Sequence, residues 1–162
     1  MEKKFTELLY QNQGIVRKIC NLYFHNRAEK DDYHQELIIQ LWKAYPSFKS
    51  KSKFSTWMYR VCLNSAIDLL RKEKTQAKTI HFENHDFVKI PDLNNESSIN
   101  QEKLYQAIAN LSETDKAIIT LYLDEFTYKE IAEIVGLSET NIGVKINRIK
   151  SIILKSFTNG NK

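Results

Sequence analysis

The sequence predicts an all-α protein made of two small helical domains joined by a flexible linker. Only 4 Gly and 2 Pro occur among 162 residues, and apolar residues recur at helical spacing along most of the chain. The periodicity lapses from residue 74 to about residue 98, a polar, Asn-rich stretch that contains Pro91. A stretch of this length is too long for a loop inside a compact domain. We therefore expect domains at 1–74 and 99–162, with 75–98 as the linker.

Three helices are expected in the first domain. The first is long and begins near the N-terminus, and the second starts at a cap formed by Asp31 or Asp32 and is ended by Pro46. The third covers about 55–73. The apolar positions of the three helices are, in order, Phe5, Leu8, Leu9, Val16, Ile19, Cys20 and Tyr23; Leu37, Ile38, Leu41, Trp42 and Tyr45; and Trp57, Met58, Val61, Cys62, Ala66, Leu69 and Leu70.

Four helices are expected in the second domain, at about 99–110, 113–125, 128–135 and 139–157. Ser112 is placed to cap the second of them. The side chains of that helix expected to face inward are Ile118, Ile119, Tyr122 and Leu123.

The last two helices have the pattern of a helix-turn-helix. Thr127 and Glu130 form a capping box, Gly136 stands where the helix must end in a left-handed residue, and Ser138 can cap the following helix. Such a motif commonly lays its second helix in the DNA major groove, although an ordinary helical corner would show the same caps. From Thr140 onward the sequence has no acidic residue, which favours contact with a polyanion.

Charge is divided unequally along the chain. Residues 1–78 hold 15 Lys and Arg against 8 Asp and Glu, residues 79–101 hold 1 against 4, and residues 102–162 hold 8 against 8. A module without net charge neutralises few phosphates. We therefore expect the helix-turn-helix region to bind DNA poorly alone and to work tethered to something else.

A basic and aromatic window without Asp or Glu extends from Leu37 to Ile67. Cations can follow phosphates while rings stack on bases, a combination suited to single-stranded nucleic acid. We favour core positions over base platforms for Trp42 and Trp57, because both lie on apolar stripes. The window contains Lys43, Lys49, Lys51, Lys53, Arg60, Trp42, Tyr45, Phe48, Phe54, Trp57 and Tyr59.

Other protein classes lack support in the sequence. No apolar run reaches the ~20 residues of a membrane span, and the start of the chain lacks a signal-peptide pattern, so we expect no membrane insertion and a cytoplasmic location. Cys20 and Cys62 are expected to be buried free thiols. We find no phosphate-binding Gly-rich loop, no paired carboxylates and no convincing metal spacing, and we favour a surface pair for His81 and His85. We expect no enzyme activity, cofactor or metal.

Three segments resemble bacterial RNA polymerase sigma factors of the sigma-70 family. Residues 32–45 look like their D-x-x-Q-E-x-F-x-x-x-W helix, and residues 54–71 resemble F-S-T-W-L-Y-x-I-x-x-N-x-x-x-D-x-x-R. The helix-turn-helix from Tyr128 to Arg148 resembles their Y-x-E-I-A-E-I-x-G-x-S-E-x-x-V-x-x-x-x-x-R pattern. With two motif sets and no third domain, the chain is similar to the extracytoplasmic-function (ECF) group.

The resemblance implies a factor that binds core RNA polymerase, directs it to promoters and opens the −10 element. By analogy, an anti-sigma protein would hold it inactive. The residues implied to dock on the polymerase β′ clamp are Asp32, Gln35, Glu36 and Gln40. Those implied to open the −10 element and hold a flipped base are Lys49, Lys51, Lys53, Phe54, Ser55, Thr56, Arg60 and Asn64.

The resemblance also implies that the second domain reads the −35 element as duplex DNA while packing on the β flap. The −35 candidates are Ser138, Thr140, Asn141, Val144, Lys145, Asn147 and Arg148. On general stereochemistry, the two Asn side chains could pair with adenine edges, and Lys145 or Arg148 with phosphates. Gly143 departs from many relatives, which carry a basic residue there; it could let the helix approach DNA closely or simply be tolerated.

Three other functions compete with this interpretation. A stand-alone helix-turn-helix regulator explains the C-terminal motif and predicts tight specific DNA binding without polymerase, but it leaves the basic and aromatic window unused. A nucleic-acid enzyme would need a catalytic constellation that we do not find. A purely helical adaptor would make the basic loop incidental.

Overall fold

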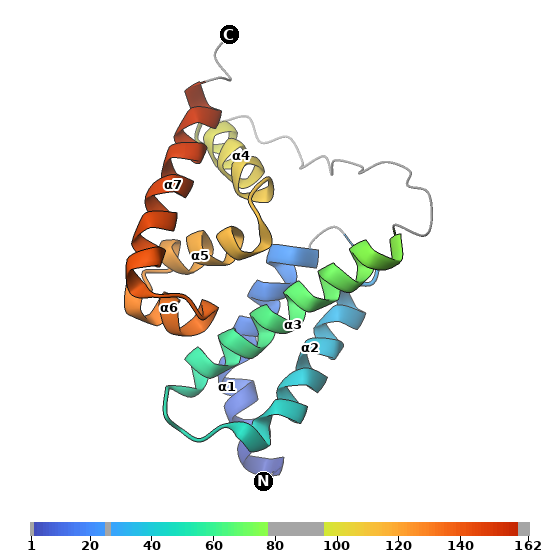
Figure 1. Cartoon of the computed structure of the whole chain (residues 1–162). Helices are drawn as coiled ribbons and strands as arrows, with labels where there is room; N and C mark the ends of the chain where they lie inside the picture. The colour runs from blue at the N-terminus through green and yellow to red at the C-terminus, as the bar shows by residue number, and fades with distance from the viewer. Residues whose placement is uncertain (1, 25–26, 78–95, 159–162) are drawn as a thin grey trace. The chain divides into compact units, whose positions relative to one another are not determined.

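The computed structural model of the protein describes residues 2–24, 27–77 and 96–158. Within these ranges the chain forms seven α-helices and one short 3₁₀ turn, and no strand (Figure 1). It divides into two compact units, Met1–Asp86 and Phe87–Lys162. The predicted all-α class with two helical domains is confirmed.

The helices on either side of the predicted linker are longer than expected. Residues 75–77 continue the third helix and residues 96–98 already belong to the fourth, so the ends of the predicted 75–98 segment are helical. The rest of that segment, with His81 and His85, lies outside the described residues.

Unit 1 is a bundle of α1 (Glu2–Phe24), α2 (Lys30–Ala44) and α3 (Phe54–Ala77), with the 3₁₀ turn η1 (Tyr45–Ser47) after α2. Each of the three helices packs against the other two (Figure 1). Their apolar stripes meet in one core, as the 3.6-residue period requires. The buried apolar residues are Phe5, Ile15, Val16, Ile19, Cys20, Tyr23, Phe24, Leu37, Leu41, Met58, Tyr59, Cys62, Leu63, Ala66 and Leu70.

The start of α2 differs from the predicted cap. Glu29 occupies the N-cap position without a side-chain hydrogen bond, while Asp31 and Asp32 lie in the first helical turn. Carboxylates in a first turn interact favourably with the positive end of the helix dipole, so these acids stabilise the start without capping it. The helix ends at Ala44, and Pro46 follows within η1, as predicted.

The two tryptophans are less buried than predicted. Trp42 is 42% exposed, and its ring meets Phe5 edge-on with centroids 5.1 Å apart. The prediction of a core position was therefore wrong for Trp42, because Leu37 and Leu41 already fill the inner face of α2. Trp57 is half-buried.

Both cysteines are free and buried, as predicted. Burial, with a smaller contribution from the nearby Cys20, raises the pKa of Cys62 to about 12. Burial also raises the pKa of Cys20, partly opposed by the charge of Lys30. Both groups therefore remain neutral thiols at physiological pH.

Unit 2 consists of α4 (Glu96–Ala109), α5 (Glu113–Leu123), α6 (Tyr128–Val135) and α7 (Glu139–Thr158). The long helix α7 packs against the other three. The buried apolar residues of the unit are Ala107, Ile108, Ala117, Ile118, Ile119, Leu121, Ile131, Ile134, Ile142, Ile146 and Ile149.

One inward-facing prediction in α5 was wrong. Leu123 is 54% exposed, and Tyr122 is half-buried. Leu121 takes the buried position one turn after Ala117 and Ile118, which leaves Leu123 at the end of the helix on its outer side.

The caps of the helix-turn-helix match the prediction. The Glu130 amide donates to Thr127 Oγ1 at 3.2 Å, and the Thr127 amide donates to Glu130 Oε2 at 2.9 Å. Gly136 has φ +74°, the left-handed conformation that ends α6. Ser138 Oγ accepts from the Asn141 amide at 3.2 Å, which closes the first turn of α7. Ser112 caps α5 in the same way.

Gly143 faces the protein rather than solvent. A Cβ atom at this position would lie 3.5 Å from Cε2 of the Tyr128 ring, which is ordinary van der Waals contact. The glycine therefore does not avoid a clash between α6 and α7. It lies in the middle of a helix, where glycine is less favourable than alanine by about 1 kcal/mol.

We expect Gly143→Ala to raise the free energy of unfolding of unit 2 by about 0.5–1 kcal/mol, because the methyl group fits and the helix gains propensity. Urea unfolding followed by far-UV circular dichroism measures the change. Both tryptophans lie in unit 1, so tryptophan fluorescence should stay unchanged. Gly14→Ala is the matched control, because it makes the same helical substitution in α1 of unit 1, where Gly14 has open space around it. Destabilisation by Gly143→Ala would show that Tyr128 cannot accept the methyl group.

Candidate nucleic-acid interface

One face of α2 presents the four residues predicted to dock on a partner protein. Asp32 and Gln35 are exposed, while Glu36 and Gln40 are half-buried. Gln40 Nε2 donates to Glu36 Oε1 at 2.6 Å, which holds the two side chains together one turn apart. The four residues therefore lie on one polar face of α2, and a hydrogen bond joins two of them.

Two apolar side chains outside the predicted docking set are also exposed on α2. Ile39 is 44% exposed, and Trp42 is 42% exposed. Large apolar residues among polar ones are typical of protein–protein interfaces. Sequence reasoning missed Ile39, which lies off the buried stripe of Leu37 and Leu41 and could have been found from its position.

The first turn of α2 is held by side chains that are distant in sequence. The Tyr33 hydroxyl donates to Glu73, and the same carboxylate pairs with Arg27 Nη1 at 2.6 Å. The Tyr33 ring stacks on Phe24 with centroids 4.0 Å apart. Glu73 thus links the C-terminal part of α3 to the start of α2, a role that the sequence did not reveal.

An aromatic cluster holds both ends of the basic loop between η1 and α3. Phe48, at the start of the loop, and Phe54, at its end, lie 5.5 Å apart in a T-shaped pair, and both pack on Trp57. Tyr45 contacts the same three rings. These rings therefore pack on one another in the protein, as favoured for Trp57, whereas the sequence left the other three open as surfaces for bases.

The cations of this loop point outward. Lys49, Lys51 and Lys53 are all exposed. Between the first two lies Ser50, with φ +53°, a left-handed conformation uncommon for a residue with a Cβ atom. The loop is thus a strongly turned segment with three exposed positive charges, which suits a phosphate backbone.

The first turns of α3 supply the remaining residues predicted to meet the −10 element. Arg60 and Asn64 are exposed one turn apart, and Ser55 is half-buried. Thr56 is only 8% exposed, so it supports the start of α3 from inside and does not offer its hydroxyl to a ligand in this conformation.

The outer face of α7 displays most of the predicted −35 residues. Val144 is 63% exposed, and its neighbours on this face are exposed as well. The buried stripe on the opposite side leaves this face free to enter a groove. The exposed candidates are Ser138, Thr140, Asn141, Val144, Asn147 and Arg148.

A buried carboxylate in α5 engages two of the predicted phosphate contacts. Arg148 Nη2 lies 2.7 Å from Asp115 Oδ2, and Lys145 Nζ lies 3.2 Å from Oδ1. The side chain of Asp115 is 8% exposed, that of Lys145 24% and that of Arg148 57%. No local sequence pattern indicates this network, since its partners lie 30 and 33 residues apart.

A third cation of α7 is also bound by α5. Lys150 Nζ donates to the Tyr122 hydroxyl at 2.7 Å and lies 4.3 Å from the centre of that ring. The hydrogen bond is the main reason that the pKa of Lys150 is raised. Three of the four basic side chains of α7 therefore make contacts with α5.

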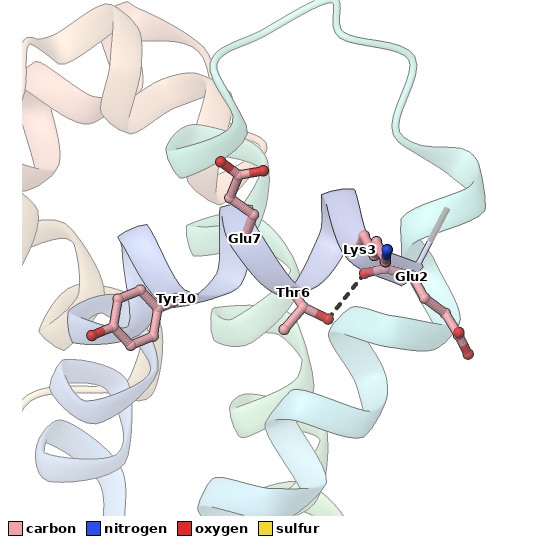
Figure 2. Close-up of a pocket in the computed structure, with 5 residues that line it drawn as sticks. All are labelled: Glu2, Lys3, Thr6, Glu7 and Tyr10. Carbon is pink, nitrogen blue, oxygen red and sulfur yellow. Dashed lines mark hydrogen bonds between the residues drawn. The ribbon is translucent and has the colours of Figure 1, made fainter.

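The remaining surface shows little that could hold a small ligand. Figure 2 shows a pocket lined by Glu2, Lys3, Thr6, Glu7 and Tyr10, all from one face of α1. Residues of a single helix give no converging set of polar groups of the kind that orients a small molecule. Within the described residues, no cluster of His, Cys, Asp and Glu could hold a metal, and no helix is long and apolar enough to cross a bilayer.

Family models match both units. The model for sigma-70 region 2 matches residues 8–76, and the model for sigma-70 region 4 matches residues 101–153. The first match contains the predicted docking residues of α2 and the basic loop, and the second contains the helix-turn-helix.

Characterised relatives match the chain across both units. The ECF RNA polymerase sigma factor SigW of Bacillus subtilis is 27% identical, with 93% of this chain and 87% of the relative covered. The ECF RNA polymerase sigma-E factor of Haemophilus influenzae is 29% identical, with 94% and 86% covered.

Solved structures share the fold. The sigma factor RpoE of Bartonella quintana, solved in complex with the anti-sigma factor NepR, has a TM-score of 0.77 and 19% identity, covering 96% of this chain and 98% of the other. CnrH, solved in complex with the cytosolic domain of CnrY, has a TM-score of 0.67 and 15% identity, covering 100% and 92%. Two family models, relatives matched over both units and this fold together show that the chain belongs to the ECF group of the sigma-70 family, the promoter-directing subunits of bacterial RNA polymerase.

Proposed function

We propose that α2 is the surface by which this sigma factor binds core RNA polymerase. The observation that carries the proposal is the combination, on one helix, of the bonded Glu36–Gln40 pair with exposed Ile39 and Trp42. A polar rim around apolar side chains is the composition of a protein interface. The partner we infer is the clamp of the β′ subunit, with Asp32 and Gln35 at the edge of the contact. The polymerase supplies the chemistry, and the chain supplies binding.

The basic loop and the first turns of α3 would then open the −10 element. A base leaves the stack at a cost of a few kcal/mol, and the protein must offset that cost with contacts made only to the opened strand. Three exposed lysines on a loop held at both ends by Phe48 and Phe54 are suited to the phosphates of a single strand. Arg60 and Asn64 offer hydrogen-bonding groups nearby in the sequence, on the same helix face.

The helix-turn-helix would read the −35 element with the outer face of α7. Asn141 and Asn147 can pair with adenine edges in a major groove, and Val144 offers an apolar contact for a thymine methyl. Apolar side chains exposed elsewhere on unit 2, including Tyr105 and Leu154, are available for the β flap. With three cations of α7 in contact with α5, we infer that this unit binds DNA firmly only within the holoenzyme.

An anti-sigma protein is a further proposed partner. The RpoE relative of known structure was solved bound to the anti-sigma factor NepR. Such an inhibitor would work by covering the surfaces that polymerase and DNA need, and the exposed apolar residues of α2 fit that role.

We expect Glu36→Lys to weaken binding to core polymerase by about 30-fold or more, as loss of an interface hot spot does, because it breaks the Glu36–Gln40 pair and reverses a charge. Gln35→Ala should weaken it less. Fluorescence anisotropy of labelled protein titrated with core enzyme measures both. Glu7→Lys makes the same charge reversal at an exposed site on α1 and should bind normally. Equal affinities for all four proteins would exclude α2 as the docking surface.

We expect replacement of Lys49, Lys51 and Lys53 by Gln to reduce strand opening about tenfold or more, because three phosphate contacts are lost. Permanganate reactivity of unpaired thymines in holoenzyme–promoter complexes measures opening. Lys72→Gln removes an exposed cation about 27 Å along α3 from Phe54 and is the control. Normal opening by the triple variant would remove the loop from the proposed site.

A further inference from the structure

The acid-free C-terminal part of α7 is electrically less basic than its sequence suggests, because α5 supplies the counter-charge. Asp115 is 5% exposed as a residue, and it is paired with both Lys145 and Arg148. These are the two cations of α7 that the sequence offers for phosphates beside the reading face. One buried carboxylate therefore pairs with both of the cations that the helix-turn-helix could offer to the DNA backbone.

Asp115 cannot release its partners cheaply. A carboxylate removed from water depends on its ion pairs, and breaking a buried pair leaves an uncompensated charge. Here two cations share one carboxylate, with one on each oxygen at 2.7 and 3.2 Å. A DNA phosphate that drew Arg148 and Lys145 outward would have to overcome this cost. The buried ion pairs therefore oppose the movement of both side chains toward DNA.

The exposure of the two cations differs, and this defines what DNA can still reach. The side chain of Lys145 is 24% exposed, whereas that of Arg148 is 57% exposed with one nitrogen on Asp115. A guanidinium has further N–H groups in a rigid fork. Arg148 can therefore present its remaining N–H groups to DNA while it shares the Asp115 carboxylate with Lys145.

We propose that Asp115 is a negative regulator of DNA affinity, a positioning residue that keeps the helix-turn-helix from binding duplex DNA without polymerase. This inference rests on the proposed function of unit 2 as the −35 reader. It assigns to α5 a role in limiting DNA affinity, which neither the family match nor the sequence of α7 reveals. Its consequence is a weak intrinsic affinity, so that promoter binding depends on the tether that core polymerase supplies.

The test is Asp115→Asn in the full chain, which keeps the side-chain shape and removes the charge. We expect tighter binding to duplex DNA and a salt dependence of log K against log salt that is steeper by about 0.9 for each freed cation, or about 1.8 for both. Anisotropy of a labelled duplex, titrated over a series of KCl concentrations, measures both quantities. Glu133→Gln removes the same charge from an exposed site on α6 and should change the slope by much less.

A double-mutant cycle with Arg148→Gln separates restraint from simple orientation. The proposal predicts a larger loss of slope from Arg148→Gln in the Asp115→Asn background than in the unmodified chain. Equal losses in both, or weaker DNA binding by folded Asp115→Asn, would overturn it. If Asp115→Asn does not fold, as circular dichroism would show, Lys145→Gln in the unmodified chain decides. A full loss of about 0.9 in slope there would mean that Lys145 is already free for DNA and would contradict the proposal. Core polymerase binding by the unmodified chain is measured alongside, so that failure of the sigma-factor function is seen separately.

Discussion

Ile142, Ile146 and Ile149 are fully buried where α7 packs against the other helices of unit 2, and the surface that we propose for DNA contact follows from their burial. Once this stripe faces inward, the helical period places Val144 and its neighbours outward. It also sets the flank that carries Lys145 and Arg148 beside α5. In unit 1, Leu37 and Leu41 do the same for α2, since their burial leaves the polar face and Ile39 to the solvent.

The two units use their charges differently. In unit 1 the lysines of the basic loop are exposed. The aromatic side chains near them pack on one another and so hold the two ends of the loop together. In unit 2 three of the four cations of α7 contact Asp115 or the Tyr122 hydroxyl. The first arrangement suits capture of a strand that becomes available only on opening. The second suits a reader whose affinity is supplied by a larger assembly.

Local features of the fold could be predicted from the sequence, because they depend on residues close together in the chain. The capping box at Thr127, the left-handed Gly136 and the helix periods are of this kind. Contacts between elements could not be predicted. Asp115 with Arg148, and Tyr33 with Glu73, join residues 33 and 40 positions apart, and no local pattern marks them. The exposure of Leu123 and Trp42 was missed for a related reason: an apolar stripe shows which residues could be buried, while neighbouring helices decide which of them are.

Specific promoter recognition, as we propose it, requires both this chain and core polymerase. The decisive measurement is the affinity for a promoter fragment, identified by run-off transcription, with and without core enzyme at physiological salt. We expect sequence-specific binding with core and only weak, salt-sensitive binding by the chain alone. Tight specific binding of the duplex by the chain alone, unaffected by core enzyme, would contradict it and would support a stand-alone regulator.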